Sequence, residues 1–197
     1  MISRITTSKM VSNKEIQNIG SVLNNTNRPL KERFRALFTL KGLGGPEAIS
    51  EMSKAFQDSS ELLKHEVAYC LGQMGDPQAI PILSEVLTDL KQEPIVRHEA
   101  GEALGAIGDL SVLELLKKIR DEDQEEVVID TCKLAVARLE WIQGQKKVEE
   151  GSLSTNPYAS TDPAPPATES DPESLRETLL NDDLELFKRY RAMFALR

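Results

Sequence analysis

The fold of this chain follows from two related stretches of sequence, Lys64-His65-Glu66-Val67-Ala68-Tyr69-Cys70-Leu71-Gly72-Gln73-Met74-Gly75-Asp76 and Arg97-His98-Glu99-Ala100-Gly101-Glu102-Ala103-Leu104-Gly105-Ala106-Ile107-Gly108-Asp109. Each stretch spaces apolar residues as a helix does. Near its end each has a glycine, Gly75 or Gly108, that suits the left-handed position after a helix. The aspartate after that glycine can cap the next helix. The two stretches therefore predict a helical repeat.

The repeat extends beyond these two stretches. Phe34, His65, His98 and Asp130 occupy equivalent positions, with steps of 31, 33 and 32 residues. A period in the thirties leaves room for two antiparallel helices and is typical of an α-solenoid, in which each unit buries its apolar face against its neighbours. We therefore predict an all-α fold with four helical-hairpin units, over about 29–58, 60–90, 93–122 and 125–143.

The composition changes after the repeats. Residues 144–172 hold five prolines among Ser, Thr, Asp and Glu, which predicts a disordered linker. Beyond it, the stretch 186–197 is identical to the stretch 30–41 at six of twelve positions. We predict a repeat array over 1–143, a linker over 144–172 and the start of a second array over 173–197. Because the last stretch ends inside a repeat unit, we also expect a truncated chain.

Charge and composition exclude several kinds of partner and location. The net charge of −8 argues against nucleic acid or an anionic membrane as the main partner. No apolar run reaches the roughly 18 residues of a spanning helix, and the polar start does not resemble a signal peptide. Cys70 and Cys132 lie in apolar helical runs away from CxxC spacing, which favours reduced, buried thiols. We expect a cytoplasmic protein.

Both histidines of the chain lie in the two repeated stretches, and each is followed by a glutamate. A repeat needs apolar residues at its recurring positions, so packing gives no reason for a His-Glu pair to recur. Equivalent helices of neighbouring units lie about 8–10 Å apart, which places the two pairs on one face. His65 and His98 with Glu66 or Glu99 would form the 2-His-1-carboxylate set of non-haem iron oxygenases. The remaining glutamate could support that site or bind a cationic substrate.

Two further side chains share the face of the histidines. Tyr69 and Glu102 each follow a histidine by four residues. They also occupy the positions where an HExxH zinc motif would have its second histidine, so that motif is absent. A role in the site and a solvated or packed side chain both remain open for these two residues.

In these motifs the sequence resembles deoxyhypusine hydroxylase, a HEAT-like-repeat di-iron monooxygenase. The resemblance runs from the first repeat unit to the end of the chain and rests on the residues Phe34 to Leu40, Lys64 to Glu66, Tyr69 to Met74, Val96 to Asp109, Asp162 to Ala167 and Arg189 to Arg197. It implies a HEAT-like α-solenoid in two four-repeat halves. Each half carries two His-Glu pairs, and the halves face one another around two irons.

The resemblance also implies a reaction and its participants. The family uses Fe(II) and O2 to hydroxylate the deoxyhypusine side chain of translation initiation factor 5A, which completes hypusine. On this chain the expected iron ligands are His65, His98 and Glu99. Glu66 belongs to the same motif and is expected either at the metal or at the amine of the substrate.

This sequence departs from the family in having one set of His-Glu pairs instead of two. We therefore predict that the isolated chain has no appreciable hydroxylase activity. Two other readings stay open. HEAT-like solenoids often serve as protein-binding scaffolds without catalysis, and phycobilin-lyase-like proteins share the repeat type.

Overall fold

The computed structural model describes residues 11–145 and 161–197, and all regular elements in these two ranges are helical. In chain order they are α1 (Asn13–Leu23), α2 (Leu30–Leu43), α3 (Gly45–Ser53), η1 (Lys54–Gln57), α4 (Glu61–Met74), η2 (Pro77–Ala79), α5 (Ile80–Thr88), α6 (Pro94–Ile107), η3 (Leu110–Val112), α7 (Leu113–Glu122), α8 (Glu126–Gln145), α9 (Pro172–Leu180) and α10 (Leu186–Leu196). The prediction of an all-α fold is confirmed.

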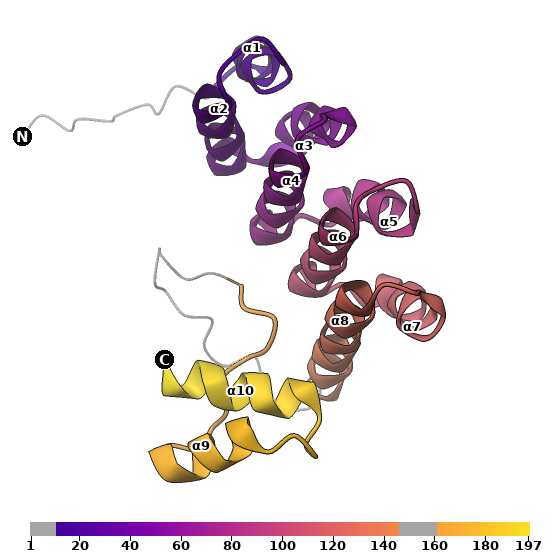
Figure 1. The fold of residues 1–197 in the computed structure, drawn as a ribbon. Helices are drawn as coiled ribbons and strands as arrows, with labels where there is room; N and C mark the ends of the chain where they lie inside the picture. Colours follow the sequence, from indigo (N-terminus) through magenta and orange to yellow (C-terminus); the bar gives the residue numbers. More distant parts are fainter. Residues whose placement is uncertain (1–10, 146–160) are drawn as a thin grey trace, which may run out of the picture.

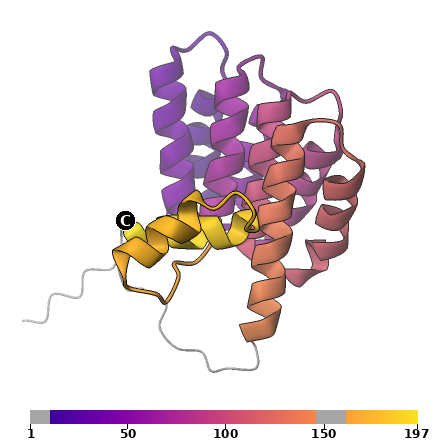
Figure 2. The same cartoon turned by 60° about the horizontal axis from the view of Figure 1, so that its bottom comes forward.

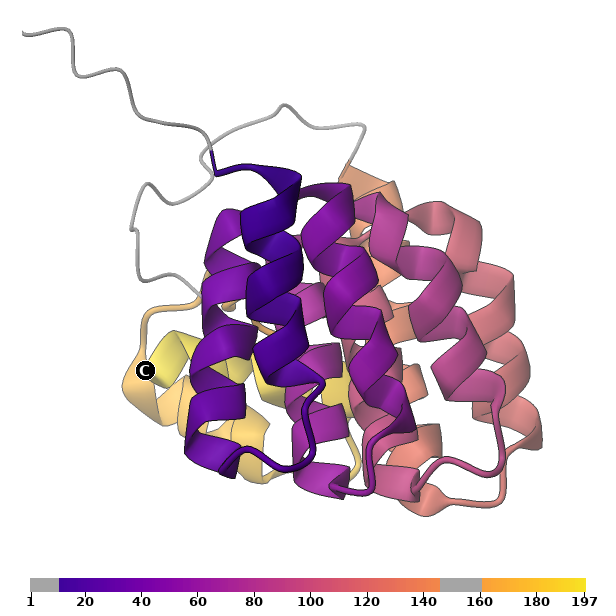
Figure 3. The same ribbon diagram turned by 90° about the horizontal axis from the view of Figure 1, so that it is seen from above.

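The first eight α-helices form two layers that stack into a curved array (Figure 1). Helices α2, α4, α6 and α8 make the inner layer, and they are the helices that begin the predicted repeat units. Helices α1, α3, α5 and α7 make the outer layer, which lies on the side away from α9 and α10 (Figure 3). This stacking of hairpins on their neighbours confirms the predicted α-solenoid.

The glycines and aspartates between the layers form the expected helix ends. Gly75 and Gly108 end α4 and α6 with φ of 64° and 78°, which a residue with a Cβ rarely adopts. Asp76 then accepts a bond of 2.9 Å from the amide of Gln78, and Asp109 caps η3 in the same way. These local turns reverse the chain, so each inner helix is followed by an outer one.

Two other glycines set how closely the inner helices approach. A Cβ at Gly72 would lie 2.7 Å from the Cα of Ala103, and one at Gly105 would lie 2.8 Å from the Cβ of Ala135. Both distances are shorter than real Cβ contacts, so only glycine fits there. Helices α4, α6 and α8 therefore pack with their backbones almost in contact, which brings equivalent side chains of neighbouring units within reach of one another.

A recurring arginine ties the start of an inner helix to the helix before it. In each case the arginine Nε donates to a carbonyl ten positions earlier. The bonds join Arg33 to Leu23 (2.7 Å), Arg97 to Leu87 (2.9 Å) and Arg189 to Leu179 (3.0 Å). The third bond shows that α9 and α10 fold as a hairpin of the same kind as α1 with α2. A second repeat array that begins at residue 173 would need such a hairpin at its start. The domain bounds 1–143, 144–172 and 173–197 stay a prediction.

The predicted linker differs from expectation where it can be seen. Its residues 146–160 lie outside the described residues, but residues 161–164, here called the strap, lie against the inner layer. Thr161 exchanges two hydrogen bonds with the side-chain amide of Gln73, of 2.9 and 3.1 Å, and Ala164 is fully buried. The array thus supplies hydrogen-bond partners that a proline-rich segment cannot supply to itself.

The α9–α10 hairpin crosses the inner side of the array beside α8 (Figures 1 and 2). The guanidinium carbon of Arg191 lies 5.7 Å from the ring centroid of Trp141 in α8, a cation–π distance. The amide of Ala167 donates to the carbonyl of Arg191 at 2.9 Å, which joins α10 to the segment after the strap.

Within residues 11–145 and 161–197, none of the helices is both long enough and apolar enough to cross a lipid bilayer.

Candidate metal centre

The two histidines lie side by side on the inner layer. His65 is in α4 and His98 is in α6, and their side chains are 25% and 23% exposed. The close contact of α4 with α6 at Gly72 places them in neighbouring helices of one face. The sequence-based expectation of one shared surface therefore agrees with their positions.

A carboxylate from one repeat unit reaches the histidine of the other. Glu99 Oε2 of α6 lies 3.1 Å from Nε2 of His65 in α4, and the Glu99 side chain is only 8% exposed. On the other side of the same ring, Glu66 Oε1 lies 3.5 Å from Nδ1. The bond with Glu99 is the main reason that the pKa of His65 lies above its usual value, although burial acts in the opposite direction.

A second grouping lies within α6. His98, Glu99 and Glu102 each offer one possible ligand atom, and these three atoms lie within 4.8 Å of one another. Donor atoms bound to one ion at about 2.1 Å are at most about 4.2 Å apart, so a small side-chain rotation would bring the three into range. Glu102 Oε2 lies 4.0 Å from Nε2 of His98. The four-residue spacing was the signal for Glu102 in the sequence, and it did not by itself distinguish a site residue from a solvated one.

The remaining groups show the electrostatic cost of this cluster. Burial raises the pKa of Glu102 to about 7, and the charges of Glu99 and Asp162 add to the effect. Burial also lowers the pKa of His98, with Glu99 opposing it and His65 adding to it. Burial and the neighbouring carboxylates thus disfavour the charged form of Glu102, while the His98 imidazole favours its neutral, ligand-competent form.

Two observations indicate that the side chains of this cluster suit a divalent transition metal. Nδ1 of His65 and Nδ1 of His98 are buried without a hydrogen-bond partner. In the described part of the chain, Glu66, Glu99 and Glu102 form ion pairs with histidine alone and none with a lysine or arginine. Imidazole nitrogens without a hydrogen bond, beside carboxylates that pair with no lysine or arginine, are a donor set that a transition metal would satisfy. The assignment of individual ligands stays a proposal.

The site is confined to two helices. At the equivalent positions of α8 the chain has Asp130, which pairs with Lys133 at 2.9 Å, and Thr131, which is buried. At those of α2 it has Phe34 and Arg35. Neither neighbour repeats the His-Glu pair, so the described residues offer one such centre, between α4 and α6.

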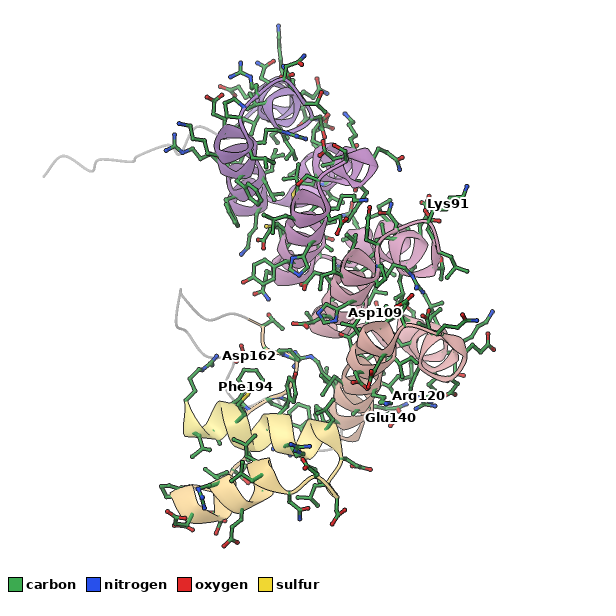
Figure 4. All side chains as sticks on the ribbon, in the orientation of Figure 1. Lys91, Asp109, Arg120, Glu140, Asp162 and Phe194 are labelled. Atoms are coloured by element: carbon green, nitrogen blue, oxygen red, sulfur yellow. The ribbon has the colours of Figure 1, made fainter. Side chains whose placement is uncertain are left out.

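The strap forms one wall of the site. Arg138 of α8 donates to the carbonyl of Gly105 at 3.0 Å and to that of Asp162 at 2.9 Å. Pro163 and Glu102 line the same small cavity. Figure 4 shows Asp162 on the inner side of the array and Lys91 on the outer side. The strap therefore lies against the carboxyl-terminal halves of α4, α6 and α8.

Known proteins share this fold and these motifs. A family model described as HEAT repeats matches residues 18–93, and one described as PBS lyase HEAT-like repeat matches residues 96–121. The chain is 60% identical to the deoxyhypusine hydroxylase of Rattus norvegicus over 95% of its own length. This chain is a relative of the deoxyhypusine hydroxylases.

Other deoxyhypusine hydroxylases give the same result. The protein of Homo sapiens is 58% identical and that of Drosophila melanogaster is 54% identical, each over 95% of this chain. A solved structure of human deoxyhypusine hydroxylase in complex with glycerol aligns with a TM-score of 0.86 over 93% of this chain. The chain spans 61% of the length of the deoxyhypusine hydroxylases named here. The resemblance seen in the sequence is confirmed.

Proposed function

We propose that this chain is a part of a deoxyhypusine hydroxylase and carries one His-Glu metal site. The complete enzyme would hydroxylate the deoxyhypusine side chain of translation initiation factor 5A, with O2 as the oxidant and two irons as the cofactor. One observation carries the proposal. Glu99 reaches His65 across the contact of two repeat units, beside His98, in a chain 60% identical to a named deoxyhypusine hydroxylase.

The proposed ligands of one Fe(II) are His65, His98 and Glu99. Two neutral nitrogens and one carboxylate suit iron, and they leave positions open for other ligands. When bound, iron would supply the activation of O2 that hydroxylation of an unactivated C–H bond needs. Glu102 is a further candidate ligand because it lies on the face of His98.

The other side chains would position ligands and substrate. Glu66 lies 3.5 Å from Nδ1 of His65, so it can fix the orientation of that ring. It can also bind an ammonium group of the substrate, since its side chain is 25% exposed. The acidic site favours a polyamine-like side chain over an anionic one. The proposed location is the cytoplasm, because Cys70 and Cys132 are both buried and free.

A protein-binding scaffold without catalysis is the second candidate function. Three apolar side chains at equivalent positions on the inner helices are exposed, Leu62 by 59%, Ile95 by 41% and Val127 by 39%. They lie three residues before His65, His98 and Asp130, so the row runs beside the two histidines on the inner helices. Such a row suits a protein partner, which could be the substrate or a partner that undergoes no reaction.

The test is iron binding by the metal-free chain. The purified chain is loaded with Fe(II) without oxygen, and bound iron per chain is measured for the wild type, His98→Ala and Glu99→Gln. Glu61→Gln is the matched control, because Glu61 is an exposed glutamate at the start of α4. We expect about one iron per chain in the wild type and the control, and less than a tenth of that in the two site variants.

Other outcomes would decide against parts of the proposal. Absence of bound iron would mean that these 197 residues do not form a metal site alone, and would favour the scaffold. Equal binding by His98→Ala and the wild type would remove His98 from the ligands. We further expect no measurable hydroxylation of a deoxyhypusine-bearing substrate by the 197-residue chain, because it carries one set of His-Glu pairs. Turnover at the rate of a full-length relative would overturn that expectation.

A further inference from the structure

A buried cation near the start of three inner helices joins each helix to the loop that begins the next inner helix. These inter-repeat ion pairs are Arg33 with Asp58, Lys64 with Glu93, and Arg97 with Asp123. The three cations occupy equivalent positions of the repeat, one residue before the position that carries histidine in α4 and α6. Each ion pair therefore connects one hairpin to its neighbour.

The second of these ion pairs joins the two helices that carry the candidate metal centre. Nζ of Lys64, in the first turn of α4, donates to Oε1 of Gln92 at 3.0 Å and pairs with Glu93, the N-cap residue of α6. Nε2 of Gln92 in turn donates to the carbonyl of Phe56 at 3.2 Å, in the turn before α4. The two residues before α6 are thus attached both to α4 and to the segment that precedes it.

The lysine at this position differs from the arginines of the neighbouring repeats. In α2 and in α6 one arginine makes two contacts, since its Nε donates to the preceding outer helix and its terminal nitrogens pair with the acid of the next loop. The ammonium of Lys64 pairs with the next loop, and Gln92 supplies the contact to the preceding segment. Lys64 and Gln92 together therefore make the contacts that a single arginine makes in the other two repeats.

The contact of His65 with Glu99 lies between two points at which α4 and α6 are attached to each other. One point is the close approach of the two backbones at Gly72, and the other is the ion pair of Lys64 at the amino-terminal ends of the helices. Gly72 is seven residues from His65, or about 10 Å along the helix axis. The approach at Gly72 alone would let the amino-terminal ends pivot apart, and the ion pair holds them together beside His65.

We propose that Lys64 is a positioning residue for the metal centre, and that its ion pair with Glu93 holds α4 and α6 at the spacing at which Glu99 reaches His65. The Lys64 ammonium bonds to Gln92 and Glu93, so it acts through the packing of the two helices and not through contact with a ligand atom. This deepens the proposed function, and it rests on that function only for the presence and identity of the metal.

The ion pair of α2 provides a direct comparison. Arg33 and Asp58 make the same kind of buried pair at the same position of the repeat, but α2 carries no histidine. A buried ion pair adds little net stability, because the desolvation of its charges offsets their attraction, and its best-attested contribution is to fix one register of packing. If Lys64 only stabilised the fold, the loss of either cation would have the same consequences. If it positions the site, the loss of Lys64 alone changes the geometry at His65.

The test applies two measurements to the 197-residue chain. Absorption titration gives the affinity for Co(II). NMR spectra that correlate 15N with 1H in the metal-free chain give the ring-nitrogen signals of His65, which respond to the contact of its Nε2 with Glu99. The chain has two histidines, so these spectra contain the signals of only two rings. Both measurements are made under conditions in which the wild type and each variant are folded, as judged by circular dichroism.

Lys64→Met should lower the affinity for Co(II) about tenfold and shift the Nε2 signal of His65, because the amino-terminal ends of α4 and α6 are no longer joined. Arg33→Met is the matched control, since it also replaces a buried cation by an unbranched apolar side chain. It should lose a similar amount of stability, keep its Co(II) affinity within about twofold of the wild type and leave the His65 signals unchanged. Lys64→Arg introduces the residue type of the neighbouring repeats and should keep the affinity within about threefold.

A second pair of variants decides the matter if Lys64→Met does not fold. Glu93→Gln removes the charged partner at the start of α6, where the carboxylate is partly exposed, and should lower the Co(II) affinity at least about threefold. Glu61→Gln makes the same charge change at an exposed position four residues before His65 and should leave the affinity unchanged. Equal Co(II) affinities of Lys64→Met and Arg33→Met, or of Glu93→Gln and Glu61→Gln, would overturn the proposal.

The result can be separated from that of the iron experiment. If the wild type binds no metal, the proposed function fails, and the His65 signals of the metal-free variants still decide the positioning role. If metal binds and neither the Co(II) affinity nor the His65 signals respond to Lys64→Met, the positioning role fails and the proposed function stands. A purely structural role of the ion pair predicts loss of thermal stability in Lys64→Met and Arg33→Met alike, without a change in either measurement.

Discussion

Nε2 of His65 and Oε2 of Glu99 lie 3.1 Å apart across the α4–α6 contact, although the two residues belong to different repeat units. The bond makes the candidate centre a property of the contact between two hairpins. The hairpin of α4 alone would offer His65 and Glu66, and that of α6 alone would offer His98, Glu99 and Glu102, so neither hairpin alone has two histidines. Predictions about the metal therefore concern the packing of α4 on α6 as much as the ligands.

Removing the charge of Glu99 should weaken metal binding more than removing that of Glu102. Glu99→Gln should lower the affinity for Co(II), used as a spectroscopic substitute for Fe(II), by about 100-fold, and Glu102→Gln by about 10-fold. The reason is that Glu99 lies near both histidines, while Glu102 approaches His98 alone. Absorption titrations measure both affinities, with Glu61→Gln as the unchanged control. A larger loss in Glu102→Gln would reverse the two roles.

A methyl group at Gly72 should separate the two halves of the site. Its Cβ would lie 2.7 Å from the Cα of Ala103, so Gly72→Ala should push α4 from α6 and lower the free energy of unfolding by about 1–3 kcal/mol. Metal affinity should fall as well. Gly42→Ala in α2 is the control, because a Cβ there meets nothing within 4 Å. It should raise stability by up to about 1 kcal/mol. Urea denaturation followed by circular dichroism measures the stability of both variants. Equal stabilities of Gly72→Ala and the wild type would show that the close α4–α6 contact at Gly72 does not limit the size of the side chain there.

The Arg97–Asp123 ion pair should make stability depend on pH. Burial alone would raise the pKa of Asp123, but the bond from Arg97 and those from nearby backbone amides outweigh it and hold that pKa below the usual 3.8. A carboxyl whose pKa is lower in the folded state contributes stability above its unfolded pKa. That contribution is lost as the pH falls through the lower, folded pKa.

The check compares Asp123→Asn with the wild type in urea at pH 7 and at pH 3. At pH 7 the variant should be less stable by about 3–5 kcal/mol, because it leaves the buried Arg97 without its charged partner. The difference should shrink at pH 3. Asp121→Asn, which breaks the exposed pair with Arg120, should change little at either pH. A difference for Asp123→Asn that is the same at both pH values would contradict the assignment.

The strap should detach when Gln73 is shortened. Gln73→Ala removes both hydrogen bonds to Thr161, so hydrogen exchange over residues 161–164 should become about tenfold faster, with little change in the array. Gln78→Ala is the control, because its side chain is exposed in the turn after α4. Unchanged exchange in Gln73→Ala would show that Arg138 and the burial of Ala164 hold the strap without it.

Much of this structure could be predicted because it depends on neighbours in the sequence. The glycines at 75 and 108 end helices as their backbone freedom suggests, and the aspartates after them cap the next element. Periodicity placed His65 and His98 at one phase of the repeat, and stacking of equivalent helices then brings them to one face. Turns, caps and helical periods arise from short-range interactions, so residue types alone are enough to predict them.

The remaining features depend on packing between distant parts of the chain. Sequence reasoning could not choose between Glu66 and Glu99, because the choice depends on how α6 is rotated against α4 at the Gly72 contact. It also left Glu102 and Tyr69 open, and it described the strap as part of a disordered linker. The position of Lys41 over Tyr69 and that of the strap beside Glu102 follow from contacts between groups far apart in the sequence. Such contacts are set by the tertiary fold, since no local pattern of residues specifies the distance between two helices.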